Sequence, residues 1–288
     1  MPRASVIASD PAAGRVEAVR LAARIRAAAD PAPDTPSAFA GEAPFAIGSA
    51  RIGPLELRVD ARRDGDAAIL ELAVRNAGDE PIHCESAAIG LRWSGAPASS
   101  LRFLRHGWQS WSFTGARDLD AAGEPAFQSG PWLRGLHHAL GARPADREGW
   151  HESELLTVVG AMPAGACCCV GVLERGRCFG VLFVRREGAD LRIEVELWLD
   201  ARLAPGEERE LESVRVALGG DPNALLEGHA DAHGRIAGAR VARPFVSGWC
   251  SWYHFFQHVT ESDVLRNLEA LAADRDGLPV EVVQIDDG

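Results

Sequence analysis

Two adjacent carboxylates, Asp286 and Asp287, directly follow the apolar run VEVVQI at 280–285. A nearly continuous apolar run of this kind is typical of a parallel strand that is covered on both faces. Side chains at the carboxyl end of such a strand lie where α/β proteins bind ligands. Because paired carboxylates repel each other, we interpret the two aspartates as ligand-binding residues, with a turn-forming Asp-Asp-Gly as the structural alternative.

An aromatic segment, GWCSWYHFF at 248–256, precedes these carboxylates by some thirty residues. It contains Trp252 and Tyr253, the only Tyr of the chain. Aromatic side chains gathered at a strand end suit the apolar face of a sugar, on which a ring stacks. The segment is therefore a candidate sugar-binding region, although core packing is the better interpretation for Phe255 and Phe256.

A second aromatic segment, FLRHGWQSWSF, lies at 103–113. The spacing of Trp108 and Trp111 fits neither the alternation of a strand nor a helix with one polar face. Gly107 and Ser110 indicate a shaped loop, and loops often carry function. Taken alone, however, the segment is better explained by packing within the loop.

Strand-like alternation fills much of the chain after residue 45. Gly- or Asp-bearing turns separate these runs, as at Arg63–Asp66, and helical patterns are scarce between them. Many short strands with such turns indicate a β-sandwich. The clearest runs are LELRVDA (55–61), AAILELAVRN (67–76), CCCVGVLE (167–174), CFGVLFV (178–184) and LRIEVELWLD (191–200).

The pattern changes to that of an α/β protein after residue 220. Asp221-Pro222 opens a predicted helix that runs to about Ala237, with Pro in its first turn. A short apolar run at 244–248 follows, and then Thr260 and Asp263 form a predicted capping box at the start of a second helix. With the strand at 280–285, this order makes one βαβ unit.

These patterns predict four segments. We interpret residues 15–29 as an Ala-rich helix and residues 30–45, with four Pro, as a linker. The predicted organisation is a leader and linker at 1–44, a mainly antiparallel β-sandwich at 45–220, a linker helix at 221–243 and the start of an α/β domain at 244–288.

Composition excludes several classes of function. The net charge of −11 argues against a nucleic-acid partner, whose phosphates would be repelled. No apolar stretch is long enough to span a bilayer, and the N-terminus lacks the apolar core of a signal peptide. The six Cys show no CxxC spacing, which favours buried thiols in a reducing cytoplasm.

Metal and cofactor sites are also not expected. His137-His138 and Trp150-His151-Glu152 resemble fragments of a metal site but have no third ligand at suitable spacing, so we interpret both as surface loops. No dinucleotide, P-loop or nucleophile-elbow motif occurs. We therefore expect no metal and no cofactor, and the sequence leaves a homo-oligomer open.

The order of the two aromatic segments and the strand-end carboxylates resembles the α-galactosidases of glycoside hydrolase family 36. GWCSWYHFF followed by VVQIDDG is similar to the opening of the family's catalytic barrel. HGWQSWSF is similar to a Trp-bearing loop of its N-terminal β-sandwich. The resemblance spans about residues 50–288 and is most specific at the C-terminal end.

This resemblance implies a β-sandwich followed by the first βαβ unit of a truncated (β/α)8 TIM barrel. It implies release of terminal α-linked galactose with retention, from α-galactoside oligosaccharides such as melibiose or raffinose. Asp286 and Asp287 match the pair that binds galactose hydroxyls, Trp252 matches a Trp lining the sugar site, and Trp111 matches the sandwich Trp that reaches over it.

The family's nucleophile and acid/base lie on later barrel strands, so we expect no catalytic residue within this chain. Asp286 and Asp287 are sequence neighbours whose side chains diverge on an extended backbone, which suits sugar binding better than attack at C1. The alternatives are an α-N-acetylgalactosaminidase, a galactosyltransferase that makes raffinose-type sugars, or a non-catalytic carbohydrate-binding protein.

Overall fold

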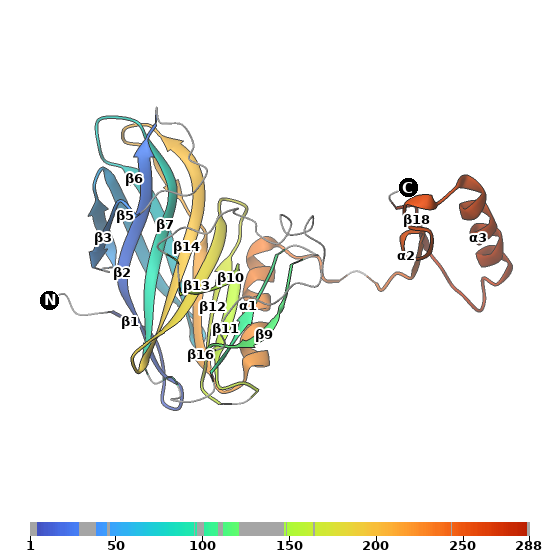
Figure 1. Ribbon diagram of the computed structural model, residues 1–288, viewed down its shortest axis with the longest axis horizontal. Coiled ribbons are helices and arrows are strands. Elements are labelled where there is room, and N and C mark those ends of the chain that lie inside the picture. Colours follow the sequence, from blue (N-terminus) through green and yellow to red (C-terminus); the bar gives the residue numbers. More distant parts are fainter. Residues whose placement is uncertain are drawn as a thin grey trace. The chain divides into compact units, whose positions relative to one another are not determined.

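The computed structural model describes residues 5–28, 39–44, 47–94, 96, 101–108, 112–120, 147, 149–163, 165–242 and 244–286. The contacts within the chain divide it into two units, which we call unit 1 (1–238) and unit 2 (239–288). Unit 1 holds the long strands, and unit 2 holds short strands and helices (Figure 1).

One sheet of unit 1 has seven strands in the described part of the chain, in the order β1-β2-β7-β14-β13-β10, with β3 paired to β2. All of these pairs are antiparallel. The strands are β1 (Ser5–Asp10), β2 (Gly14–Ala27), β3 (Gly41–Pro44), β7 (Ile82–Ser94), β10 (His151–Glu154), β13 (Phe179–Glu187) and β14 (Asp190–Leu203).

The other sheet has nine described strands in the order β4-β5-β6-β16-β12-β11-β8-β9, with β15 paired to β6. It is also antiparallel throughout these pairs. The strands are β4 (Gly48–Ile52), β5 (Leu55–Asp64), β6 (Ala67–Asn76), β8 (Arg102–Arg105), β9 (Gly115–Asp118), β11 (Leu156–Gly160), β12 (Cys167–Leu173), β15 (Glu208–Glu210) and β16 (Ser213–Gly219).

Alternate side chains of both sheets form one apolar core. Leu21, Ile89 and Val195 come from the first sheet, and Leu70 and Val216 come from the second; all five are buried. A core shared by two sheets in this way is that of a β-sandwich, as predicted. Cys168 joins this core, whereas Cys167 and Cys169 face the other side of β12, so the three neighbouring thiols alternate as expected.

The prediction of a helix at 15–29 is wrong, because this segment forms β2. β2 pairs with β7 along most of its length, from Arg15↔Ser94 to Ala27↔Ile82. Ala and Arg favour helices as isolated residues, but long-range pairing overrides so weak a preference. The sandwich therefore begins before the predicted boundary at residue 45, since β1, β2 and β3 all precede it.

Helix α1 (Pro222–Ala237) confirms the helix predicted to begin at Asp221-Pro222 and to run to about Ala237. The Asp221 side chain caps it by accepting from the Asn223 N–H, and Gly238 ends it in the left-handed conformation. α1 covers β12 and β16 and buries Leu225, His229 and Ala232. A Cβ atom at Gly171 of β12 would lie 2.4 Å from Cε1 of His229, so the imidazole fills the space that glycine leaves.

Unit 2 contains β17 (Gly248–Cys250), α2 (Trp252–Phe255), the 3-10 turn η3 (Phe256–His258), α3 (Glu261–Ala273) and β18 (Val282–Gln284). β17 and β18 are parallel, with α3 between them in sequence. Thr260 and Asp263 form the predicted capping box. Both strands are shorter than predicted. β17 begins at Gly248, which is the last residue of the short apolar run predicted at 244–248.

Candidate functional site

The carboxyl ends of β17 and β18 bring four polar side chains together in unit 2. Cys250 lies opposite Gln284 in the parallel register. The Ser251 N–H donates to the Gln284 carbonyl at 3.2 Å, which extends the pairing by one residue. The Asp286 N–H in turn donates to the Ser251 hydroxyl at 3.0 Å, and Ser251 is fully buried. The backbone at Asp286 is therefore fixed by the neighbouring strand.

The Asp286 carboxylate is held by side chains from both strands. Its Oδ2 accepts from the Cys250 thiol at 3.5 Å and from the Gln284 side-chain amide at 3.1 Å. Hydrogen bonds to a charged acceptor are stronger than those between neutral groups. The carboxylate is thus oriented before any ligand binds, as a binding group needs to be.

Asp286 also lies at the rim of an apolar groove. The groove has a volume of about 490 Å³ and is lined by α3, the residues before it and the end of the β18 segment, including Val264, Leu268 and Ile285. Small-molecule sites typically combine apolar walls with a few oriented polar groups. A charged acceptor beside apolar walls suits a ligand that has both hydroxyls and an apolar face, such as a sugar.

Four aromatic residues of unit 2, at 252, 253, 255 and 256, lie on α2 and η3, immediately after β17. Trp252 is half-buried and meets Phe256 edge-on, with ring centroids 5.6 Å apart. Tyr253 is 85% exposed. Phe256 is 53% exposed, so the prediction of core packing for this residue is wrong within unit 2.

The aromatic loop of unit 1 follows β8, at His106–Thr114, and its two ends are tied together. Gly107 donates its N–H to the Thr114 hydroxyl at 3.1 Å. A Cβ atom at Gly107 would lie 2.2 Å from Cβ of Ser112, so only glycine fits there. Trp108 is about half-exposed, and its ring meets Phe179 edge-on at 5.8 Å. These contacts hold the described residues on either side of 109–111, whereas Ser110 of the predicted loop lies outside the described residues.

The structure describes three of the five predicted site residues. Trp252, Tyr253 and Asp286 all lie in unit 2, within one short stretch of structure around the strand ends. Trp111 and Asp287 lie outside the described residues. Sequence reasoning missed Cys250, Ser251 and Gln284; the two-residue spacing of Gln284 and Asp286 on an extended strand was the available signal.

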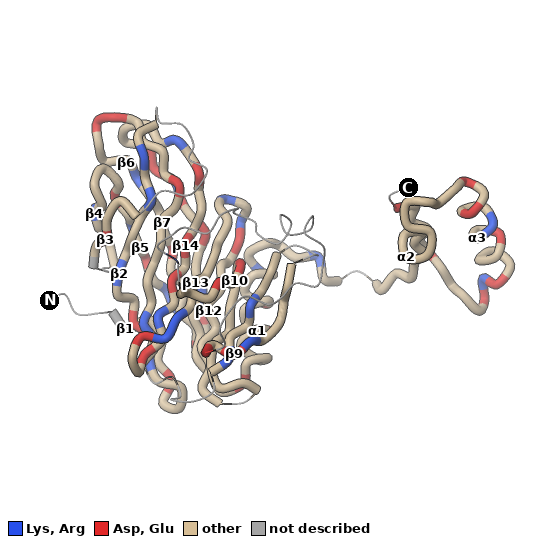
Figure 2. Tube along the Cα trace, in the orientation of Figure 1, with Lys and Arg blue, Asp and Glu red and all other residues tan. Residues whose placement is uncertain are grey.

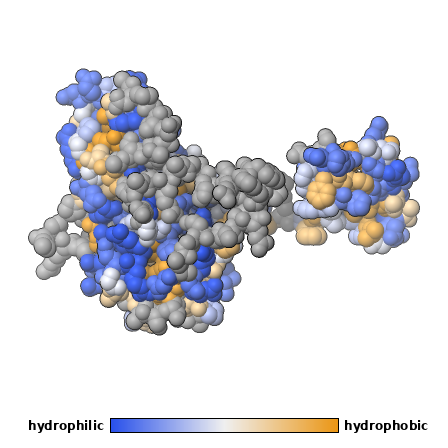
Figure 3. Space-filling model, in the orientation of Figure 1, coloured by the Kyte–Doolittle hydropathy of each residue, from blue (hydrophilic) through white to orange (hydrophobic). Residues whose placement is uncertain are grey.

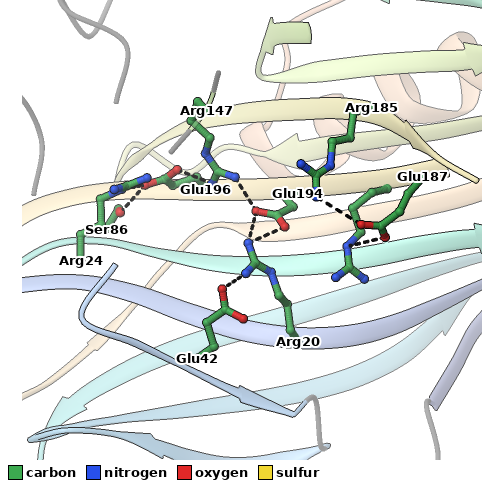
Figure 4. Close-up of polar contacts among 10 residues, drawn as sticks. Arg20, Arg24, Glu42, Ser86, Arg147, Arg185, Glu187, Glu194 and Glu196 are labelled. Carbon is green, nitrogen blue, oxygen red and sulfur yellow. Dashed lines mark hydrogen bonds and ion pairs between the residues drawn. The ribbon is translucent and has the colours of Figure 1, made fainter. Parts of the chain in front are cut away.

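A buried charge network on the seven-stranded sheet was also missed. Basic and acidic residues are spread over both units (Figure 2), but Arg24, Arg147, Glu194 and Glu196 are almost completely buried. Arg147 donates to Glu194 and, at 2.7 Å, to Glu196, and Arg24 and Ser86 also donate to Glu196 (Figure 4). Burial alone raises the pKa of Glu194, but Arg20 and Arg147 outweigh it and hold this pKa below its ordinary value.

The segment around His151 is part of this sheet and not the predicted surface loop. His151 and Glu152 belong to β10, and Trp150 is buried beneath the guanidinium groups of Arg147 and Arg185. His137 and His138 lie outside the described residues. The described His, Cys, Asp and Glu side chains form no group of three that would hold a metal ion.

The described thiols have no disulfide partners. All six Cys are free, and burial raises the pKa of Cys84 and Cys169 to about 12. Thiols of this kind behave as small apolar side chains. Among the described helices, none combines the length and the apolar character needed to cross a membrane.

No family model matches the chain. Among solved structures, the α-galactosidase from Lactobacillus brevis is similar over 100% of this chain and 34% of its own, with a TM-score of 0.51 and 10% identity. The galactosidase domain of the α-galactosidase–sucrose kinase AgaSK is similar over 96% of this chain and 37% of its own, with a TM-score of 0.51 and 13% identity. The chain shares the fold of the N-terminal region of α-galactosidases. It spans about a third of the length of these proteins.

Proposed function

We propose that this chain is the N-terminal part of a retaining α-galactosidase, in which unit 2 begins a (β/α)8 barrel. The observation that carries the proposal is Asp286, held by two side chains at the carboxyl end of a parallel strand. Strand ends of this kind are where barrel enzymes bind their substrates. The fold likeness to α-galactosidases over nearly the whole chain supports the same assignment.

In this proposal Asp286 and Asp287 bind hydroxyls of the terminal galactose. A carboxylate that accepts from a hydroxyl distinguishes galactose from glucose, because the wrong epimer leaves the carboxylate without that hydrogen-bond donor. Trp252 and Tyr253 supply aromatic surface for the apolar face of the sugar ring. A sugar-binding role for Trp111 stays a prediction from the resemblance of its motif, because this residue lies outside the described residues.

The chemistry itself needs two further carboxyl groups. Retaining hydrolysis uses a nucleophile and an acid/base about 5–5.5 Å apart, on either side of the glycosidic bond. The resemblance places both on later barrel strands, as aspartates. We therefore propose that this chain positions α-galactosides such as melibiose or raffinose, and that residues 1–288 alone do not hydrolyse them.

The proposal is tested by sugar binding to the 288-residue chain. Titration with melibiose, followed by isothermal calorimetry, should show binding that Asp286→Ala abolishes and Asp276→Ala leaves unchanged. Asp276 is an exposed acid in the turn after α3, so it controls for the loss of one charge in unit 2. Equal affinity for melibiose in the wild type and in Asp286→Ala would refute the assignment of Asp286.

A further inference from the structure

The outer face of the seven-stranded sheet carries two buried carboxylates. Glu194 and Glu196 lie two positions apart on β14, so their side chains point to the same face of the sheet. Val195 between them belongs to the apolar core, which places both carboxylates on the opposite, outer face. Both residues are almost completely buried. A buried charge is stable only where it is paired and hydrogen-bonded, so the contacts of these two residues define what this face binds.

Contacts from two neighbouring strands hold Glu194 in place. Arg20 of β2 donates to Oε2 of Glu194 at 2.6 Å. Both residues have the same partner, Gly90, on β7, which lies between their strands. A Cβ atom at Gly90 would lie 2.6 Å from Cγ of Arg20, so glycine leaves the space in which Arg20 crosses β7. Glu194 is therefore oriented by contacts that do not involve Arg147.

Glu196 is held in the same way and leaves one oxygen for Arg147. Its Oε1 accepts from Nε of Arg24 at 2.5 Å and from the Ser86 hydroxyl at 2.6 Å. Its Oε2 accepts from Nη2 of Arg147 at 2.7 Å, and Nη1 of Arg147 donates to Glu194 at 2.5 Å (Figure 4). One planar guanidinium thus bridges two carboxylates, which a single ammonium group does not do with the same geometry.

Three aromatic rings enclose the same guanidinium. Cζ of Arg147 lies 4.2 Å from the ring centroid of Phe183, 5.0 Å from that of Phe39 and 5.4 Å from that of Trp150. These distances are within the range of cation–π attraction, which is strongest where water is excluded. Arg147 is 1% exposed. Its Nε is buried without a hydrogen-bond partner among the described atoms, so both bonds use the terminal nitrogens, which a free guanidinium ion also has.

The charges of the cluster also call for one more cation. Apart from Arg147, the described side chains joined by ion pairs in this cluster are three carboxylates and two guanidinium groups: Glu42, Glu194, Glu196, Arg20 and Arg24. These five side chains leave one negative charge in excess, which Arg147 balances. A planar cation with one charge and several N–H donors fits both the charge and the geometry.

We propose that Glu194, Glu196, Phe39, Trp150 and Phe183 form a guanidinium receptor, and that Arg147 is a positioning residue that sets the start of β10 by docking there. The Trp150 N–H donates to the Arg147 carbonyl at 3.2 Å, and β10 begins at the next residue. The Ser153 hydroxyl of β10 in turn accepts from the His106 N–H at 2.8 Å. The docked side chain therefore fixes the strand that holds one end of the aromatic loop. This inference is independent of the proposed function.

Chemical rescue of Arg147→Ala in the 288-residue chain tests the receptor. The variant should have a lower thermal midpoint of unit 1 than the wild type, because two buried carboxylates lose a partner. At constant ionic strength, about 100 mM guanidinium chloride should shift the midpoint of the variant upwards by about 3–5 °C relative to its effect on the wild type, as a ligand at about ten times its dissociation constant does. The receptor of the wild type is filled, so there guanidinium acts only as a weak denaturant.

Urea is the matched control ligand, since it is planar and of similar size but uncharged. It should not raise the midpoint of Arg147→Ala, and neither should sodium chloride. Where Arg147→Ala does not fold by itself, the comparison is made on refolding from urea. Guanidinium should then increase the refolded yield, and sodium chloride should not.

Two variants control for the site. Arg185→Ala removes a guanidinium that lies 4.3 Å from the Trp150 ring centroid but pairs at the surface with Glu187, so guanidinium should affect it as it affects the wild type. Arg147→Ala combined with Glu194→Gln leaves the receptor one carboxylate, and the upward shift should be lost. An upward shift of the same size in either control would overturn the receptor.

Hydrogen exchange followed by mass spectrometry tests the positioning of β10. Its amides should exchange about 10-fold faster in Arg147→Ala than in the wild type, and guanidinium should restore their protection. The β5–β6 hairpin of the other sheet is the internal reference and should not change. Equal midpoint shifts by guanidinium in Arg147→Ala and in the wild type would overturn the receptor. A specific shift with unchanged β10 exchange would overturn the positioning role.

Discussion

Units 1 and 2 differ in how far they bury their apolar side chains. In unit 1, two antiparallel sheets face each other and bury a large shared core. In unit 2, Val264 is the only apolar side chain that is buried among those described, and Phe245, Leu265, Val282 and Ile285 are all about half-exposed or more. Hydrophobic surface is accordingly visible on unit 2 (Figure 3). Two antiparallel sheets can bury their apolar faces against each other, whereas a sheet of parallel strands needs other elements on both of its faces.

The largest expected difference between the two units is in their resistance to limited proteolysis. Trypsin should cleave first after Arg240, Arg266 or Arg275, all exposed residues of unit 2, and leave a resistant sandwich. Local opening is easiest where few apolar contacts hold the chain. Mass spectrometry of the early fragments provides the measurement. If residues 245–288 survive as long as the sandwich does, the contrast between the units is wrong.

The buried charge network should give the next largest effect. Glu196→Ala removes the buried carboxylate that accepts from Arg24, Arg147 and Ser86, which should destabilise unit 1 by about 3–5 kcal/mol. Glu71→Ala removes an exposed partner of Arg62 and should change stability by less than about 1 kcal/mol. Urea denaturation followed by circular dichroism measures both. Similar losses in the two variants would mean that burial of the network contributes little.

His229 makes the stability of unit 1 depend on pH. Burial, with Arg215, His233 and His106 nearby, lowers the pKa of His229 to about 4 from its ordinary 6.5. The unfolded chain therefore binds a proton more readily than the folded one, so stability is complete above pH 6.5 and falls as the pH drops towards 4. The loss should be on the order of 2–3 kcal/mol.

The measurement is the thermal midpoint of unit 1 between pH 7 and pH 4.5. His229→Gln should flatten the part of this profile that comes from His229. His233→Gln is the control, since His233 lies one turn further along α1 and is less buried. A profile that keeps its full slope in His229→Gln would exclude this histidine as the cause.

The smallest expected effects come from the helix caps. Asp221→Ala should destabilise unit 1 by about 1 kcal/mol, because α1 covers the nine-stranded sheet and loses one of its terminal hydrogen bonds. Thr260→Ala should cost α3 a similar amount but leave the unit 1 transition unchanged. Calorimetry distinguishes the two. A lower unit 1 midpoint in Thr260→Ala would show that the units unfold together.

Local patterns predicted the structure well where neighbouring residues decide it. β6 matches the predicted strand at 67–76, and the cap of α3 was read from Thr260 and Asp263 alone. β2 was missed because its decisive partners are far along the chain: Arg24, for example, meets Glu196 across 172 positions. No local pattern contains that pairing.

In the candidate site, too, the features set by neighbouring residues could be predicted and those set by long-range pairing could not. The position of Asp286 after an apolar run was readable, since strand and carboxylate are adjacent in sequence. The role of Cys250 was not, because it depends on a parallel register that brings residue 250 beside residue 284. Glu154, whose side-chain Oε2 accepts from the Trp108 N–H at 2.9 Å, was missed for a similar reason, because 46 positions separate the two residues.

The close approach of Gly171 and His229 limits the substitutions that these two positions can accept during evolution. The imidazole occupies the space that a side chain at position 171 would need, so the two positions cannot vary independently. A relative with alanine or a larger residue at 171 should carry a smaller residue than histidine at 229. Within one lineage, the substitution of His229 by a smaller residue should precede the substitution of Gly171 by a larger one. Such paired exchange would also remove the acid sensitivity that His229 confers.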